Sequence, residues 1–438
     1  VTILNTEGMH KSLPGRIALY LMILATPVHV ATADILSVNV DGTGDFTSIQ
    51  AAVDSADDGD WILVGPGVYT EPSDQVVDLV GKSIVVQATG TAQETIIDGE
   101  GIRRGIFCGN GETPATIIEG FTIRNCVATW YDWNGNGAID FWEYFGGGCW
   151  NRNGSNPTIR GCVFVENQAE YGGAIYNGDE TGVAADPRLE GCQFLDNGIS
   201  QGLGGAIYNM SSSPVLTDCI FSGNRSYFGG AVLNFNGSDP TFEGCAFLLN
   251  HASSDGGAMY NDASEPALTN CDFIENTASD DGGAIFNADP SSNANIPVFE
   301  GCTFRANTAS GEGGAVHNFS TSPIISHCEF LENGANAGGA IYSWNSSSPA
   351  IGSTMICGNT PDQIGGPFSD QGSNMISEDC GNGCSTDLDG DGTTGGGDLG
   401  LLFVAWGRCA GCAADFNDDG VVNGRDLGVM FVAWGPCF

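Results

Sequence analysis

The sequence predicts an all-β fold, a right-handed parallel β-helix solenoid, followed by a small α-helical calcium-binding domain. Two observations predict the solenoid: Gly-Gly-Ala occurs seven times, and Cys-x-Phe-x-x-Asn occurs seven times in alternation with it. A third observation predicts the small domain, since two Asp-rich loops with similar apolar segments follow the repeats. One such repeat cannot bury its own apolar face, but stacked copies can.

The cysteines of the repeat define its period. Their spacings are 30, 27, 26, 26, 31 and 26 residues, so the base period is 26 with short insertions. Within a unit, apolar residues come in groups of two or three bounded by Gly, Asn and Pro, which indicates short strands. Each coil should then advance the solenoid by about 4.8 Å. The repeat cysteines are Cys162, Cys192, Cys219, Cys245, Cys271, Cys302 and Cys328.

Stacking in register predicts ladders of identical residues. We expect the phenylalanines to form an internal aromatic stack. The asparagines should occupy a bend, because Asn tolerates left-handed conformations and its amide can bond to the next copy. The repeat cysteines should remain free thiols, since side chains in register point the same way. The ladders comprise Phe164, Phe194, Phe221, Phe247, Phe273, Phe304 and Phe330, and Asn167, Asn197, Asn224, Asn250, Asn276, Asn307 and Asn333.

Residues 1–33 have the pattern of an upstream extension and a secretory signal peptide. Lys11 and Arg16 form a positively charged segment before an apolar run over 17–25, and Ala31-Thr32-Ala33 is an A-x-A cleavage site. The mature chain is therefore expected to begin at Asp34 and to be secreted or displayed at the cell surface, where disulfides form. No other segment is apolar and long enough to predict a membrane span.

The charge balance limits the partners. The chain has 53 acidic and 13 basic residues, a formal net charge of −40, and no lysine after Lys82. Such a field repels nucleic acids and attracts cations. We therefore exclude nucleic acid as the main partner.

Residues 34–379 are assigned to the β-helix. The segments 45–53 and 61–71 resemble the entry of a pectin lyase-type β-helix, with a short amphipathic helix over about 48–56 that caps the first coil. The alternation of Phe-x-x-Asn with Gly-Gly-Ala over 157–343 resembles the repeat of polymorphic outer-membrane proteins, which are surface adhesins. That resemblance implies a β-helix that acts as an adhesive surface.

The segment 384–437 carries two candidate calcium loops offset by 28 residues. Each places oxygen ligands at positions 1, 3, 5 and 12 and glycine at position 6, which is the EF-hand loop pattern. The candidate Ca²⁺ ligands are Asp387, Asp389, Asp391 and Asp398 in the first loop, and Asp415, Asn417, Asp419 and Asp426 in the second. Two such loop–helix halves resemble a dockerin domain, which implies a cohesin-like protein as partner. The alternative is a calcium-stabilised tail that anchors the chain to the cell envelope.

Four cysteines flank the two loops symmetrically. One pairing closes each half separately, Cys384–Cys409 with Cys412–Cys437. Another closes the ends, Cys384–Cys437 with Cys409–Cys412. Secretion favours disulfides over a zinc site at Cys409 and Cys412.

A third candidate calcium loop interrupts an early coil at 132–143. All the oxygen positions of an EF-hand loop are filled, including glutamate at position 12. The alternative is an Asn- and Gly-rich turn. The candidate ligands are Asp132, Asn134, Asn136, Asp140 and Glu143.

Three carboxylates stand directly before a Gly-Gly pair in successive repeats. These candidate catalytic residues are Asp255, Asp281 and Glu312, and Asp280 adds a fourth acid. Stacked about 4.8 Å apart, they would raise one another's pKa, recruit a cation, hold a sugar chain, or act as a glycosidase pair. The alternative is a solvated acidic turn. His317 replaces the aromatic residue of its repeat and is interpreted as a filler.

The sequence favours a non-catalytic function. Polyuronate lyases need a basic residue beside bound calcium, and the arginines after Lys82 stand at non-equivalent repeat positions. We therefore predict a calcium-binding adhesion or carbohydrate-binding platform that contacts polysaccharide, with the tail as its anchor. The alternative is a polysaccharide hydrolase or lyase carried by a dockerin-type module.

Overall fold

A computed structural model describes residues 33–128, 144–179, 181–289, 295–378, 380, 386, 388–389, 393–409, 412–417, 420–432 and 434–436. The predicted signal peptide and the candidate calcium loop at 132–143 lie outside these residues, so both remain predictions. Among the described helices, none combines the length and apolar character needed to cross a bilayer.

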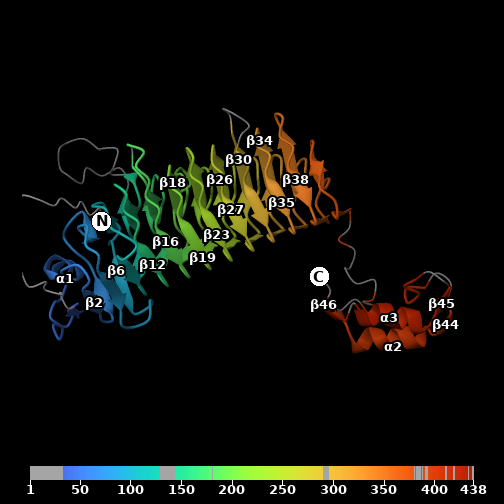
Figure 1. Cartoon of the computed structure of the whole chain (residues 1–438), viewed down its shortest axis with the longest axis horizontal. Helices are drawn as coiled ribbons and strands as arrows, with labels where there is room; N and C mark the ends of the chain where they lie inside the picture. The colour runs from blue at the N-terminus through green and yellow to red at the C-terminus, as the bar shows by residue number, and fades with distance from the viewer. Residues whose placement is uncertain are drawn as a thin grey trace, which may run out of the picture. The chain divides into compact units, whose positions relative to one another are not determined.

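The predicted solenoid is confirmed as a parallel β-helix, because each coil passes through three sheets whose neighbouring strands are all parallel. The Pro-x-aliphatic segments form a 13-stranded sheet (Figure 1). Its strands are β1 (Ile35–Val38), β2 (Trp61–Val64), β5 (Val85–Ala88), β8 (Ile117–Glu119), β12 (Thr158–Arg160), β16 (Arg188–Glu190), β19 (Val215–Thr217), β23 (Thr241–Glu243), β27 (Ala267–Thr269), β31 (Val298–Glu300), β35 (Ile324–Ser326), β38 (Ala350–Gly352) and β41 (Ser369–Asp370).

The Cys-x-Phe segments form a 12-stranded sheet. Its strands are β3 (Gly67–Tyr69), β6 (Thr95–Asp98), β9 (Thr122–Arg124), β13 (Val163–Val165), β17 (Gln193–Leu195), β20 (Ile220–Ser222), β24 (Ala246–Leu248), β28 (Asp272–Ile274), β32 (Thr303–Arg305), β36 (Glu329–Leu331), β39 (Met355–Cys357) and β42 (Met375–Ser377). Short strands beyond the Asn bend add β10 (Val127–Ala128), β14 (Gln168–Ala169), β21 (Arg225–Ser226), β25 (His251–Ala252), β29 (Thr277–Ala278) and β33 (Thr308–Ala309).

The segments that follow Gly-Gly-Ala form an 11-stranded sheet. Its strands are β4 (Gln75–Asp78), β7 (Arg104–Cys108), β11 (Cys149–Asn151), β15 (Ile175–Asn177), β18 (Ile207–Met210), β22 (Val232–Phe235), β26 (Met259–Asp262), β30 (Ile285–Ala288), β34 (Val316–Phe319), β37 (Ile341–Trp344) and β40 (Ile364–Gly365).

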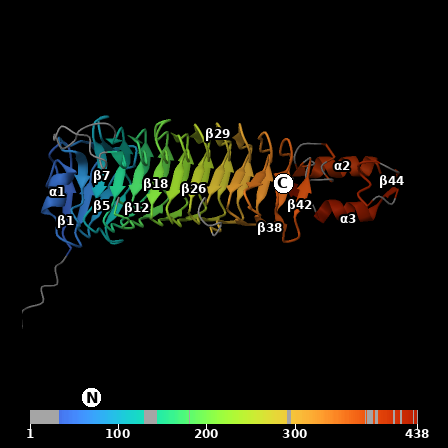
Figure 2. The ribbon, with the colours of Figure 1, turned by 90° about the horizontal axis from the view of Figure 1, so that it is seen from above.

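The predicted capping helix is confirmed as α1 (Ile49–Ser55). The hydroxyl of Ser48 accepts a hydrogen bond from the amide of Ala51 at 3.1 Å, which is an N-cap. Ala52 and Val53 are buried in the core, and α1 lies beside β1 at the first coil (Figure 2). The helix thereby shields apolar residues that no earlier coil covers.

The predicted phenylalanine stack is confirmed. All seven rings are fully buried, their centroids are 4.5–5.2 Å apart and neighbouring planes differ by 1–9°. Burial of a phenylalanine side chain contributes roughly 1.5–3 kcal/mol of transfer free energy. The stack is therefore a main source of the solenoid's stability.

The asparagine ladder is confirmed as a hydrogen-bonded stack, but its predicted conformation is wrong. The side chain of Asn224 donates to Oδ1 of Asn250 at 2.9 Å and to the carbonyl of Phe194 at 2.9 Å. The left-handed residue is the one before each Asn, such as Leu249 with φ of +55°. The Asn side chain must point inward to bond to buried backbone, so the preceding residue makes the turn.

A second asparagine ladder follows Gly-Gly-Ala, and the sequence analysis did not anticipate it. Each amide donates to Oδ1 of the next at 2.7–2.9 Å. All members are fully buried, so their amides depend on one another for hydrogen bonds. The members are Asn151, Asn177, Asn209, Asn234, Asn261, Asn287 and Asn318.

The repeat cysteines are buried free thiols, as predicted. Burial raises the pKa of the Cys162 thiol to about 12. Cys357 forms a disulfide with Cys380, and Cys409 forms one with Cys412. The latter agrees with the second predicted pairing of the tail, whose other pair lies outside the described residues.

Each of the two glycines in the Gly-Gly pair is required for its own structural reason. The first glycine of each pair has φ between +60° and +70°, a left-handed conformation that disfavours side chains. At the second, the coils approach too closely for a side chain: a Cβ on Gly283 would lie within 2.0 Å of the carbonyl oxygen of Gly314.

The C-terminal unit contains α2 (Gly396–Val404) and α3 (Gly424–Val432), as the apolar segments predicted. Leu402, Ala414, Val422 and Met430 form its small core. Two antiparallel pairs join its halves. Their strands are β43 (Thr393–Thr394) with β46 (Gly435–Pro436), and β44 (Gly407–Arg408) with β45 (Val421–Val422).

Candidate functional site

The outer face of the 11-stranded sheet carries a continuous row of mostly aromatic side chains. Alternation along a strand places Ile175 in the main core and Tyr176 in a second apolar cluster. The register of the sheet aligns the equivalents of Tyr176 on successive coils. We call this row the aromatic ladder; it comprises Phe107, Trp150, Tyr176, Tyr208, Leu233, Tyr260, Phe286, His317 and Tyr342.

A second row, the pre-glycine ladder, borders the aromatic ladder. Its members are Phe145, Tyr171, Leu203, Phe228, Asp255, Asp281, Glu312 and Ala337, connected from coil to coil by backbone pairing. Each pre-glycine ring packs on the aromatic ladder one coil further on. The ring of Phe145 stacks on Tyr176 at 4.2 Å, and the ring of Phe228 lies 4.8 Å from that of Tyr260. The pre-glycine ladder changes from apolar to acidic after Phe228.

A cavity of about 240 Å³ lies against both ladders before this change. Six apolar or aromatic side chains and one carboxylate line it: Leu203, Tyr208, Phe228, Leu233, Phe235, Tyr260 and Asp262. Largely apolar walls with a few polar groups, here the Asp262 carboxylate and the hydroxyls of Tyr208 and Tyr260, are typical of small-ligand sites. We call this cavity the aromatic pocket.

The aromatic pocket changes the ionisation of its polar groups. Burial, followed by repulsion from Asp289, raises the pKa of Asp262. Burial, followed by the carboxylates of Asp262 and Asp255, raises the pKa of Tyr260 well above its ordinary value. The Tyr260 hydroxyl therefore stays protonated at neutral pH and can donate a hydrogen bond.

The acidic end of the pre-glycine ladder brings the three predicted carboxylates onto consecutive coils. Oδ1 of Asp255 accepts a hydrogen bond from the amide of Asp281 at 3.0 Å, and Oδ1 of Asp281 accepts one from the amide of Glu312 at 2.7 Å. Oxygens of Asp255, Asp280 and Asp281 lie within 4.8 Å of one another. The predicted register of these residues is confirmed, whereas their catalytic role remains a prediction.

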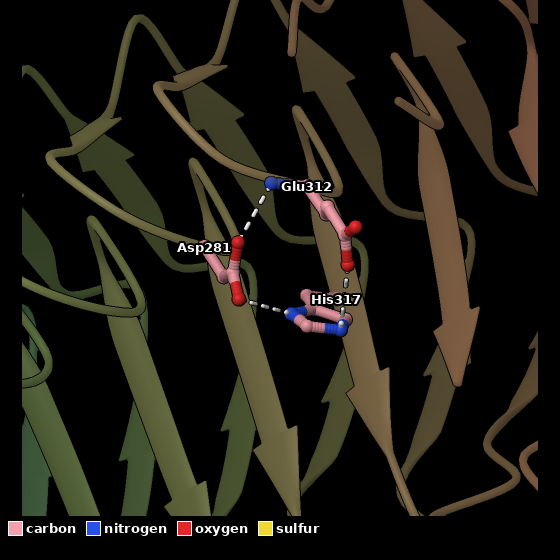
Figure 3. Close-up of side chains that lie close together, drawn as sticks. All are labelled: Asp281, Glu312 and His317. Atoms are coloured by element: carbon pink, nitrogen blue, oxygen red, sulfur yellow. Dashed lines mark hydrogen bonds and ion pairs between the residues drawn. The ribbon is translucent and has the colours of Figure 1, made fainter. Parts of the chain in front are cut away.

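His317 joins this row, a neighbour that the sequence analysis missed when it interpreted the residue as a filler. Its Nδ1 lies 3.1 Å from Oδ2 of Asp281, and its Nε2 lies 4.0 Å from Oε2 of Glu312 (Figure 3). The His317 side chain is 3% exposed, and its ring meets Phe286 and Tyr342 edge to face. The three residues thus form a partly open carboxylate–imidazole cluster.

The cluster separates the pKa values of neighbouring carboxylates. Burial, reinforced by Asp281 and Asp280, raises the pKa of Asp255 against the lowering effect of the Asp281 amide. Burial also acts to raise the pKa of Asp281. The contact with His317 and the hydrogen bond from the Glu312 amide outweigh it, so the pKa of Asp281 lies below its usual value. Asp281 is therefore ionised at neutral pH.

In the C-terminal unit, the last predicted ligand of each loop, Asp398 or Asp426, is buried and accepts hydrogen bonds from backbone amides of its own loop. Asp398 accepts hydrogen bonds from the amides of Leu388, Asp389 and Gly395 at 2.6–3.1 Å. Asp426 accepts equivalent bonds from Phe416, Asn417 and Asn423 at 2.8–3.3 Å.

The first predicted ligand of the second loop is also turned into its loop, since Asp415 accepts a bond from the amide of Gly420 at 2.8 Å. These contacts form the tight turn that an oxygen-ligand site needs. The remaining predicted tail ligands, Asp387, Asp391 and Asp419, lie outside the described residues.

The fold defines a class of protein, a parallel β-helix with one aromatic and acidic face. The family model for the right handed beta helix region matches residues 81–247 and 226–356. The chain therefore belongs to the right-handed β-helix family, which confirms the predicted handedness.

Two curated relatives share part of the chain. It is 36% identical over 85 residues to the "Probable autotransporter YfaL" of Escherichia coli strain K12, covering 19% of this chain and 7% of that one. It is 30% identical over 138 residues to a "Cell surface glycoprotein" of Methanothermus fervidus, covering 30% and 22%. The matches span well under a third of either relative. Among solved structures, a rhamnogalacturonan lyase aligns at 11% identity and a TM-score of 0.41, covering 82% of this chain and 88% of that one.

Proposed function

We propose that this protein is a carbohydrate-binding platform that is secreted or held at a cell surface and binds a polysaccharide at its aromatic pocket. The observation that carries the proposal is the aromatic pocket, where Tyr208, Phe228 and Tyr260 surround one carboxylate, Asp262. Aromatic rings offer flat apolar faces for the C–H faces of a sugar, and Tyr260 and Asp262 supply a hydrogen-bond donor and acceptor. The names of the two relatives support the surface location.

Repetition suits the site to a polymer rather than to a single sugar. Most of the aromatic ladder is buried, but Tyr171, Leu203 and Phe228 of the pre-glycine ladder are partly exposed on successive coils, at the strand spacing of about 4.8 Å. Contacts that recur along one direction can hold successive parts of an extended chain, and each adds affinity by raising the effective concentration of the next. We therefore expect longer oligosaccharides to bind more tightly than short ones.

Binding to a panel of neutral and acidic polysaccharides, measured by affinity electrophoresis and calorimetry, tests the proposal. Replacing Phe228 and Tyr260 with alanine should weaken binding about tenfold or more, a loss of about 1.4 kcal/mol or more. Trp61→Ala is the matched control, since Trp61 is 42% exposed on β2 of another sheet. Equal binding by the double variant and the parent would refute the proposal.

A polysaccharide-active enzyme is the second candidate, favoured by the pairing of Asp281 with Glu312 beside His317. A low pKa at Asp281 suits an ionised base or nucleophile. Release of reducing ends or unsaturated products from the same panel would establish turnover. The Asp281→Asn and Glu312→Gln variants should then lose it.

For the tail we propose a calcium-stabilised anchoring unit, with a cohesin-like protein or the cell envelope as its partner. Asp389, Asp398, Asp415, Asn417 and Asp426 are the described residues that would hold Ca²⁺, together with the other predicted ligands. Bound calcium would neutralise these acids and fix the two loops against α2 and α3. A pull-down with cohesin-bearing proteins, with and without chelator, tests the choice of partner.

A further inference from the structure

We propose that Asp281, Glu312 and His317 form a binding site for a divalent metal ion of the zinc class. The site lies on the coils of β30 and β34, beyond the aromatic pocket. It depends on neither the proposed sugar binding nor the proposed calcium loops. It is therefore a separate chemical capability of the solenoid.

The donor atoms already lie close together. One oxygen from each carboxylate and one nitrogen of His317 all fall within 4.8 Å of one another. Two atoms that ligate one tetrahedral zinc ion, each about 2.0–2.2 Å from it, stand roughly 3.4 Å apart. Glu312 has a long side chain that is 37% exposed, so a change of its rotamer can close the difference.

The imidazole supplies the second, independent observation. His317 is almost fully buried, yet neither of its ring nitrogens makes a hydrogen bond of good geometry within the described part of the chain. A buried polar atom without a well-aligned hydrogen bond is costly, and such atoms commonly mark an absent water or ion. Because Phe286 and Tyr342 hold the ring edge to face, its nitrogens are fixed toward the two carboxylates.

The surrounding charge favours a cation. Asp255 and Asp280 lie beside Asp281, so four acids gather on three adjacent coils. Within the described ranges, no arginine or lysine forms an ion pair with any of them, and His317 is the only basic residue paired with them. Concentrated negative charge without basic partners raises the local concentration of metal cations.

The donor set selects the kind of metal. Calcium takes six to eight oxygen ligands, whereas this site offers one imidazole nitrogen and two carboxylates. Zinc accepts this combination, and three protein ligands leave a fourth position for water or substrate. Asp281 is 23% exposed, so that fourth position can be reached from solvent.

Calorimetric titration of the metal-stripped full-length protein with Zn²⁺ tests the site. Excess Ca²⁺ is present throughout, so that any oxygen-only loops are already occupied and do not take up Zn²⁺. The absorption spectrum of Co²⁺ bound in place of Zn²⁺ reports whether the coordination is tetrahedral. We expect one Zn²⁺ per chain at this site. His317→Tyr restores the aromatic residue of the repeat, as in Tyr342, so the solenoid should fold. The His317→Tyr variant should bind Zn²⁺ at least about 100-fold more weakly than the parent, a larger loss than the 10–100-fold typical of outer-shell changes.

Two further variants sharpen the test. Asp281→Asn keeps an oxygen for the amide of Glu312 but loses the ligand charge, and should weaken Zn²⁺ binding by more than the roughly 10–100-fold typical of outer-shell changes. Glu243→Gln alters an exposed carboxylate on β23 and should leave binding unchanged. Absence of Zn²⁺ binding by the parent protein, or parental affinity in His317→Tyr, would overturn the proposal.

Discussion

Asp281 on one coil contacts His317 on the next, with 3.1 Å between Oδ2 and Nδ1. The same offset brings Tyr171 against Tyr208, whose ring centroids are 5.5 Å apart. One backbone geometry therefore produces an aromatic contact in early coils and an ionic contact in later ones. The chemistry of this face of the solenoid follows from which side chain precedes each Gly-Gly pair.

The phenylalanine stack should dominate the stability of the solenoid. Phe247→Ala removes a fully buried ring between two stacked neighbours and should lower the free energy of unfolding by about 3–5 kcal/mol. Denaturant titration followed by circular dichroism measures the loss. Ile324→Ala is the control, because Ile324 is 45% exposed on β35 and should cost under about 0.5 kcal/mol.

The first asparagine ladder should be sensitive to a single break. Asn224→Ala removes the acceptor of the Asn197 backbone N–H and the side-chain donor to the carbonyl of Phe194, at about 1–3 kcal/mol for each buried group left unsatisfied. Asn336→Ala, at an exposed position, should change stability little. Parallel thermal melts compare the two, and equal melting temperatures would contradict a structural role for the ladder.

The second glycine of each pair should tolerate no side chain. Gly283→Ala would drive a Cβ into the carbonyl of Gly314, so we expect a loss of about 3 kcal/mol or a failure to fold. Gly334→Ala is the matched control, since its Cβ would meet nothing closer than 3.5 Å. Soluble yield and urea midpoints distinguish them; a stable Gly283→Ala protein would show that the coils can separate.

The buried thiol of Cys162 should make the solenoid less stable in alkali. The pKa of Cys162 rises from 9.0 to about 12 in the folded chain, so between these values the native state holds a proton that the unfolded state has lost. Stability is therefore full below about pH 9 and falls as the pH rises toward 12. Urea titrations across this range should show a smaller decline in the free energy of unfolding for Cys162→Ala than for the parent. In a separate experiment, the native repeat cysteines should not react with a thiol reagent at pH 8.

Calcium should protect the tail from proteolysis. Residues 384–438 contain only two trypsin sites, Arg408 and Arg425. If the loops bind Ca²⁺, a chelator should speed cleavage at both sites, because the loops then lose the ion that orders them. Asp426→Asn keeps oxygen acceptors but removes a ligand charge, and should reduce the protection. Equal cleavage rates with calcium and chelator would argue against the predicted loops.

The repeat revealed most of the fold, because a residue that recurs every 26 positions must lie in one row. It could not reveal which residue turns the chain at the bend, since either Leu249 or Asn250 could adopt the left-handed conformation. The hydrogen bonds of the buried Asn250 side-chain amide decide which residue turns the chain, and these bonds form only between neighbouring coils.

The carboxylate–imidazole cluster was hidden for a different reason. Asp281 and His317 are 36 residues apart, whereas Phe228 and Tyr260, which make the equivalent contact, are 32 apart. Insertions between coils vary this spacing, so no fixed sequence interval marks the contact. Only the alignment of strands β30 and β34 brings the aromatic position of one repeat to the acid of the preceding one.

The common register of all the ladders also has a genetic consequence. Loss of residues 219–244 would remove one whole coil and join Asp218 to Cys245, leaving every remaining Phe, Asn and Gly-Gly pair in its row. It would delete Phe228 and bring the acidic cluster one coil nearer to Tyr171. Unequal recombination between repeats therefore offers single steps that lengthen the solenoid, shorten it or remove the aromatic pocket while the ladders stay in register.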